Sequence, residues 1–293
     1  MPRSKSRTKR TPTKKAAAKK KSGGDLTLWK PFVNADQALY FNIATKALYG
    51  LTFLGVQGDA CTKFYGEECG TALCQELPKW MGLINLTFAA SAFNTLRNGS
   101  ASDKKRHLFT MSIQWMGWFV WMITTGAKGA GGLLVDNEYY MGLACIFLGM
   151  MISRMGGDGA SLDPVSQVLN TTQNKVTAFL NFMVLFNTFN VGVMGGRGYW
   201  EAAGETPSAS CQAMCGFLGV SIFLTIMDGN YWMNCTGTVR KNSYVIQIAV
   251  SLVGMYLTFS GPSLAATGTD MAIVNYVVNG LQIAMSAHAY NGM

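Results

Sequence analysis

Residues with side chains able to bind a solute recur within long apolar stretches of this sequence. They follow the three- and four-residue steps that place side chains on one face of a helix, as Gln247, Ser251 and Thr258 do. Amides and hydroxyls in this pattern can line a pathway for a small polar or anionic solute. They also hold transmembrane helices together, so both interpretations stay open. The candidate pathway residues are Asn42, Lys46, Thr87, Ser91, Asn94, Asn181, Ser221, Thr225, Asp228, Gln247, Ser251, Thr258, Asn275, Asn279, Gln282 and Ser286.

Lys46 is the most informative of these candidates because a charge within an apolar stretch is costly. It lies roughly 12 Å along the stretch 37–57 by helix rise. Its ammonium can either reach the inner surface along its flexible stem or face a wet cavity and bind a ligand there. No carboxylate at similar depth is evident as its partner, since we interpret Asp228 as lying near the membrane interface. The scarcity of buried acids argues against a proton-driven pump.

The cysteines predict a different chemistry. A bias of cysteines toward one side of the predicted membrane predicts one or two disulfides in an oxidising compartment, with a pairing that the sequence cannot give. The candidates are Cys61, Cys69, Cys74, Cys211 and Cys215. The sequence holds two histidines and no HExxH, GxSxG or phosphate-loop motif. We therefore expect no enzyme, no metal site and no cofactor.

The elements that would position these residues are membrane helices. Only 13% of the residues are charged, against about 25% in soluble proteins. Apolar stretches of about 20 residues, the length that crosses a bilayer, occur eight times. They predict an all-α integral membrane protein with spans near 37–57, 80–97, 108–127, 139–155, 176–195, 213–229, 243–261 and 271–289.

The direction of these spans follows from the charges between them. Every second connection is rich in Lys and Arg, as at 104–106 and 240–241, and the others carry acids. The positive-inside rule then predicts that both termini are cytosolic in a multi-pass protein. Three sequons, at Asn98, Asn170 and Asn234, fall on the predicted inner side. Their glycosylation would indicate the inverted topology.

The sequence also contains an internal similarity. A shift of 134 residues pairs Gly82 with Gly216 and Asn94 with Asp228, and a shift of 137 pairs Cys74 with Cys211. Two halves of four spans each enter the membrane in the same direction, which predicts two parallel four-helix repeats. The expected organisation is a basic cytosolic tail at 1–28, repeat A at 29–157, an inner linker at 158–175 and repeat B at 176–293.

The basic tail accounts for the whole net charge of +9. Ten of the 24 basic residues lie within the first 21 positions, where no acid occurs. The tail lacks the apolar residues that a folded core needs, so we expect a disordered arm. It can fix the topology or contact anionic lipid headgroups, and we expect no nucleic-acid partner.

Two functions remain from the sequence. The first is a transporter or channel for a small polar or anionic solute, bound between the two halves. The alternative is a non-transporting, tetraspan-like scaffold or accessory subunit of a larger membrane complex, which predicts a dry interior and partner proteins in a homo- or hetero-oligomer.

Overall fold

The computed structural model of the chain describes residues 34–56, 59–60, 71–125, 149, 169, 171–188, 200–201, 204–235 and 237–293, which are helices and the short turns beside them. Residues 32–293 form one compact unit. Its described elements are α1 (Ala35–Phe53), α3 (Ala72–Asn98), α4 (Ala101–Thr125), α7 (Thr172–Thr188), α9 (Ala209–Asn234), α10 (Gly237–Ser260) and α11 (Pro262–Asn291). The described residues contain no strand, which confirms the all-α prediction. The basic tail and the expected fourth span at 139–155 fall outside the described residues, apart from Gly149.

Polar caps begin the helices earlier in the chain than the apolar stretches that predicted them. The side chains of Asn34, Thr71 and Ser208 each accept a hydrogen bond from the backbone N–H three residues later. Such caps satisfy backbone groups at a helix start and let the first turn be hydrophilic. The side chain of Thr171 likewise accepts from the backbone N–H of Asn174, and α7 begins at Thr172, within the segment 158–175 expected to be a linker.

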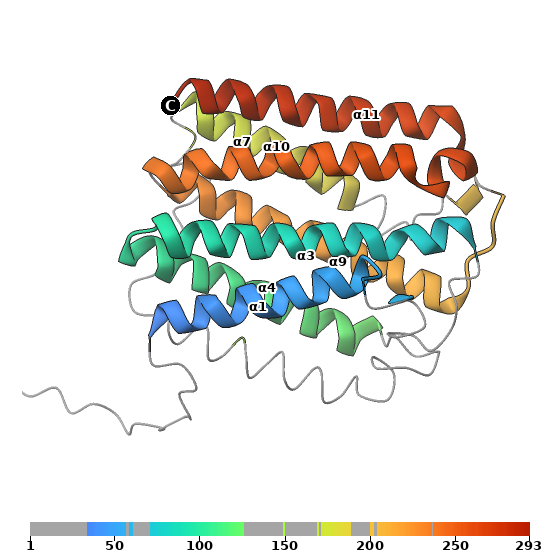
Figure 1. The fold of residues 1–293 in the computed structure, drawn as a ribbon, viewed down its shortest axis with the longest axis horizontal. Helices are drawn as coiled ribbons and strands as arrows, with labels where there is room; N and C mark the ends of the chain where they lie inside the picture. The colour runs from blue at the N-terminus through green and yellow to red at the C-terminus, as the bar shows by residue number, and fades with distance from the viewer. Residues whose placement is uncertain are drawn as a thin grey trace, which may run out of the picture. The chain divides into compact units, whose positions relative to one another are not determined.

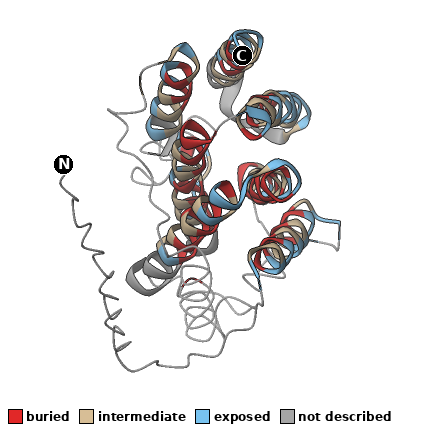
Figure 2. Ribbon diagram, turned by 90° about the vertical axis from the view of Figure 1, so that its left-hand side faces the viewer, coloured by how far each residue is buried: buried red, intermediate tan, exposed pale blue. Residues whose placement is uncertain are grey.

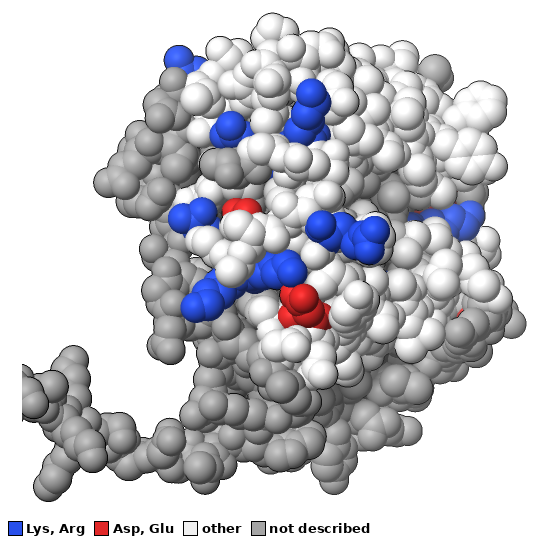
Figure 3. Space-filling view, turned by 60° about the vertical axis from the view of Figure 1, so that its left-hand side comes forward, with Lys and Arg blue, Asp and Glu red and all other residues white. Residues whose placement is uncertain are grey.

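One end of the helices is defined by three polar contacts. The ammonium of Lys104, near the start of α4, lies 2.8 Å from the Asp36 carboxylate at the start of α1. Arg106 donates to the carbonyl of Asn234, where α9 ends. Arg240, at the start of α10, donates to Asn174 at the start of α7. Figure 3 shows Lys and Arg side chains gathered on this face, which we call the basic end.

The opposite end is fixed by a disulfide between Cys74 and Cys211, whose Cα atoms are 5.6 Å apart. This bond joins the starts of α3 and α9, so these two helices run parallel to each other. Helices α1, α4, α7 and α10 run from the basic end, and α3, α9 and α11 run toward it (Figure 1). Consecutive described helices therefore alternate in direction, except α4 and α7, which both run from the basic end and are separated in the chain by residues outside the described part.

Helices α1 and α3 approach each other through glycine. A Cβ atom added at Gly82 would lie 2.8 Å from the carbonyl oxygen of Gly50, too close for any side chain. Small residues at such a crossing let two backbones come together, a common device between membrane helices. Helix α3 also packs against α9 and α10, and α9 packs against α4 and α7. Helices α3 and α9 thus form the centre of the described part.

Polarity is distributed against the pattern of a soluble protein. In the described part, 23 polar or charged residues are buried, while 20 large apolar side chains are exposed. Phe182, Tyr256 and Phe259 are each at least 65% exposed. Exposed and buried residues follow opposite faces of individual helices in Figure 2. Helices that hide polar groups and present apolar ones suit hydrocarbon surroundings.

Two of the described helical segments are each long and apolar enough to cross a membrane, judged by length and composition alone. They are Met214–Asn234, with a mean hydropathy of 1.2, and Gly237–Ser260, with a mean hydropathy of 1.5. Helix α3 carries a buried Glu and a row of buried Asn, Thr and Ser residues, which lower its mean hydropathy. The expected number of eight spans is therefore not confirmed.

Candidate functional site

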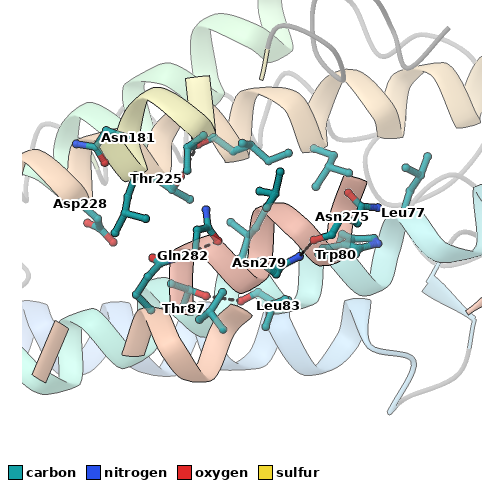
Figure 4. A pocket seen from close by; sticks show the side chains of 18 of the residues that line it. Leu77, Trp80, Leu83, Thr87, Asn181, Thr225, Asp228, Asn275, Asn279 and Gln282 are labelled. Carbon is teal, nitrogen blue, oxygen red and sulfur yellow. Dashed lines mark hydrogen bonds between the residues drawn. The ribbon is translucent and has the colours of Figure 1, made fainter. Parts of the chain in front are cut away.

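A cavity of about 230 Å³ lies between α3, α7, α9, α10 and α11. Figure 4 shows side chains from these helices converging on it. Its volume is just below the roughly 300 Å³ at which pockets for drug-sized ligands begin, so it suits a smaller solute. The candidate residues that line it are Thr87, Asn181, Thr225, Asp228, Gln247, Asn275, Asn279 and Gln282.

The cavity is elongated along the helices. Its α9 lining recurs every three or four residues from Cys215 to Trp232, a distance of about 25 Å by helix rise. Its α3 lining runs from Leu73, close to the disulfide, to Thr87. A bilayer has a hydrocarbon core of about 30 Å, so the cavity extends over most of that thickness.

Amides occupy the middle of the cavity. The Oε1 atom of Gln282 accepts hydrogen bonds from Gln247 at 3.3 Å and from Ser251 at 3.0 Å. Asn279 donates to the carbonyl of Asn275, one turn earlier on α11. Asn181 of α7 packs against the backbone of α9 at Gly229, where a Cβ atom would overlap with its amide. These contacts order the wall while leaving amide atoms on the cavity surface.

Two acids line the cavity, and they lie toward opposite ends of it. Glu76 is four residues after the start of α3, beside Gly261 where α10 turns into α11. Asp228 is six residues before the end of α9 and is only 3% exposed. The Oδ1 atom of Asp228 accepts a hydrogen bond from Gln114, and its Oδ2 atom makes no hydrogen bond of standard geometry with a described residue. The interpretation of Asp228 as an interfacial residue is therefore wrong, because α4 and α9 enclose it.

Lys46 does not line the cavity and is 1% exposed. Its ammonium lies 3.1 Å from the ring centroid of Trp118, 4.4 Å from Trp115 and 5.4 Å from Phe88. Aromatic faces attract a cation, which offsets part of the cost of burying it. Lys46 also interacts electrostatically with Asp228. The ammonium of Lys46 therefore neither reaches the inner surface nor faces a wet cavity, which were its two expected positions. The expectation that no carboxylate lies near it is also wrong.

Most of the remaining candidates connect helices or satisfy their own backbone, whereas the buried hydroxyl of Ser286 has no hydrogen-bond partner among the described residues. Trp115 donates to Asn42, and Trp118 donates to Ser221. The side chain of Trp232 donates to Ser91. The others, Asn94, Ser251, Thr258 and Ser286, are buried outside the cavity lining. Eight of the 16 candidates thus lie at the cavity, and the other eight lie outside its lining.

The cysteines are confirmed in part. Of the five disulfide candidates, Cys74 and Cys211 pair with each other, while Cys215 is a buried free thiol. Cys61 and Cys69 lie outside the described residues. Burial also raises the pKa of the Cys235 thiol, at the connection between α9 and α10, above its usual value. A thiol that stays protonated is a poor nucleophile, so Cys235 is a packing residue.

Several lining residues were missed from the sequence, among them Glu76, Trp80 and Tyr244. Trp80 lies seven residues before Thr87 and Tyr244 lies three before Gln247, so the helical step could have found both. Glu76 precedes the expected span 80–97, so the apolar stretch that predicted this helix does not include it. Among the described residues, no group of three His, Cys, Asp or Glu side chains could hold a metal ion.

Comparisons with protein-family models, with curated proteins and with solved structures found no match. The site is therefore interpreted from its own geometry and chemistry.

Proposed function

We propose that this chain is a multi-pass membrane protein that moves a small polar solute through the cavity between α3, α7, α9, α10 and α11. The observation that carries the proposal is the long cavity, lined by amides, hydroxyls and acids, inside helices that expose apolar side chains. Building such a cavity buries polar groups that lipid cannot satisfy. A solute pathway is a reason for a protein to retain them.

The proposed topology has eight spans with both termini in the cytosol. It is supported by the contacts that bring Lys104, Arg106 and Arg240 to one end of the helices. Cytosolic ends of membrane helices are enriched in Lys and Arg. Six of the described helices contain 19 to 30 residues, which suffices or nearly suffices for a bilayer core.

The two halves are proposed to be parallel repeats about an axis between α3 and α9. Cys74 bonds to Cys211, a residue 137 positions later. The caps Thr71 and Ser208 are also 137 positions apart and accept equivalent bonds. Equivalent residues meet each other only at a two-fold axis, so the bonded cysteines and the matching caps support a parallel repeat.

Solute uptake into liposomes tests this proposal. The probes are erythritol, tetramethylammonium and methanesulfonate, which are neutral, cationic and anionic. In a variant with both Asn279→Leu and Gln282→Leu, uptake of the transported probe should fall about tenfold or more, because buried partners lose their hydrogen bonds and the wall becomes apolar. The control is Leu281→Val, since Leu281 is the exposed neighbour of Gln282 on α11.

Two results would contradict a transport function. One is uptake of every probe at the rate of protein-free liposomes. The other is uptake that the double variant leaves unchanged. Either result would favour the scaffold or accessory-subunit interpretation.

A further inference from the structure

We infer that the solute is a small organic cation of the alkylammonium class. The inference rests on the proposed function. It replaces the expected polar or anionic solute by a positively charged one. Asp228 is the recognition residue, Glu76 is the second acid on the path, and aromatic side chains form part of the wall between them.

The charges of the lining residues favour a cation. Among the described residues that line the cavity, Glu76 and Asp228 are charged, and none is Lys, Arg or His. Lys46, which interacts electrostatically with Asp228, is held against the rings of Trp115 and Trp118 outside the lining. An anion in the cavity would meet a carboxylate toward each end. A cation would be attracted at both, and more strongly than in water because the surroundings are apolar.

Asp228 places a buried carboxylate at the edge of the cavity (Figure 4). Gln114 donates to Oδ1 and thereby helps to fix the orientation of the carboxylate. Oδ2 makes no hydrogen bond of standard geometry with a described residue, and the Ser91 hydroxyl and the Lys46 ammonium also interact with the carboxylate. A cation in the cavity would add a favourable charge–charge interaction, which needs no N–H donor.

The walls favour an organic cation over a metal ion. Trp80, Trp232 and Tyr244 contribute aromatic surface to the lining, and aromatic faces attract alkylammonium groups. Hard metal ions instead require several oxygen ligands converging on one point. Glu76 and Asp228 lie toward opposite ends of a long cavity and cannot supply that arrangement together. The chain already uses aromatic rings to bury an ammonium group, at Lys46.

The test compares uptake of tetramethylammonium, potassium, erythritol and methanesulfonate by liposomes containing the full-length protein or its Asp228→Asn variant. Asn keeps the shape of the side chain and an oxygen that can accept from Gln114, but removes the charge. Tetramethylammonium should be the preferred probe of the unmodified protein. Its uptake should fall about tenfold or more in the variant, the effect of losing one charged contact, whereas erythritol uptake should change less than about twofold.

Glu76→Gln is the second variant, so the test does not depend on the folding of one protein. It should also lower tetramethylammonium uptake, and the control Leu281→Val should leave it unchanged. Preference for methanesulfonate, erythritol or potassium over tetramethylammonium would overturn the inference while leaving transport intact. Unchanged tetramethylammonium uptake in both acid variants would overturn it as well. Absence of uptake for all four probes would instead contradict the proposed function.

Discussion

Replacing Cys74 and Cys211 together by Ser should lower the free energy of unfolding by about 4 kcal/mol. The bond closes a loop of 137 residues, and cross-links over loops of this length remove much of the conformational freedom of the unfolded chain. It also joins the starts of α3 and α9, the two helices at the centre of the described part. The measurement is thermal or denaturant unfolding of the purified protein in detergent, followed by circular dichroism.

Reduction of the unmodified protein provides the matched control. A reductant should lower its unfolding midpoint to that of the double variant and should not affect the double variant further. Under non-reducing conditions, mass spectrometry of a digest should find a peptide that joins Cys74 to Cys211. Equal midpoints with and without reductant, together with free thiols at both positions, would contradict this part of the structure.

Lys46→Ala should destabilise the protein by about 3 kcal/mol. Removing a long buried side chain leaves a cavity that commonly costs 2 to 5 kcal/mol, and contact of the ammonium with three aromatic rings is lost in addition. Lys46→Met keeps most of the volume and removes the charge. It should therefore cost about 1 to 2 kcal/mol, which separates packing from electrostatics.

A double-mutant cycle tests whether Lys46 stabilises the carboxylate of Asp228. The two residues interact electrostatically, so Lys46→Met leaves a buried charge less compensated. Adding Asp228→Asn should recover part of the lost stability, and the two changes should be non-additive by at least about 0.5 kcal/mol. Strict additivity would show that the aromatic rings alone stabilise the lysine.

The sequence predicted the helical class because it depends on local features. Apolar stretches between polar connections gave α3, α9 and α10, and Lys104 and Arg240, from two of the basic connections, lie at one end of the described helices. The ends of the helices were less accurate. Thr71 and Ser208 extend α3 and α9 with polar first turns, which average hydropathy cannot assign to a helix.

The site was harder to predict because it depends on which faces meet. Gln282 and Asp228 were singled out by their helical spacing, but spacing gives a face and not its neighbour. Lys46 shows the limit clearly, since its surroundings come from Trp115 and Trp118 on α4. These residues are distant in the sequence, and only the packing of α1 against α4 brings them to the lysine. The sequence could not show the surroundings of Asp228 for the same reason, because Gln114, which donates a hydrogen bond to it, is distant in the sequence.

The central claim is that helices with an apolar exterior enclose a polar cavity that water can enter. Cysteine accessibility tests it in membranes, using a background that keeps only Cys74 and Cys211. A membrane-impermeant thiol reagent that carries a trimethylammonium group is applied to both sides of the membrane. Three variants are compared: Gln282→Cys in the cavity, Val277→Cys on the exposed face of α11 and Ala92→Cys in the packed core. We predict rapid labelling at position 282 and little at 277 or 92, since thiols in lipid or in a packed core do not ionise. Labelling at 282 that is no faster than at 92 would contradict the cavity, and rapid labelling at 277 would contradict the apolar exterior facing lipid.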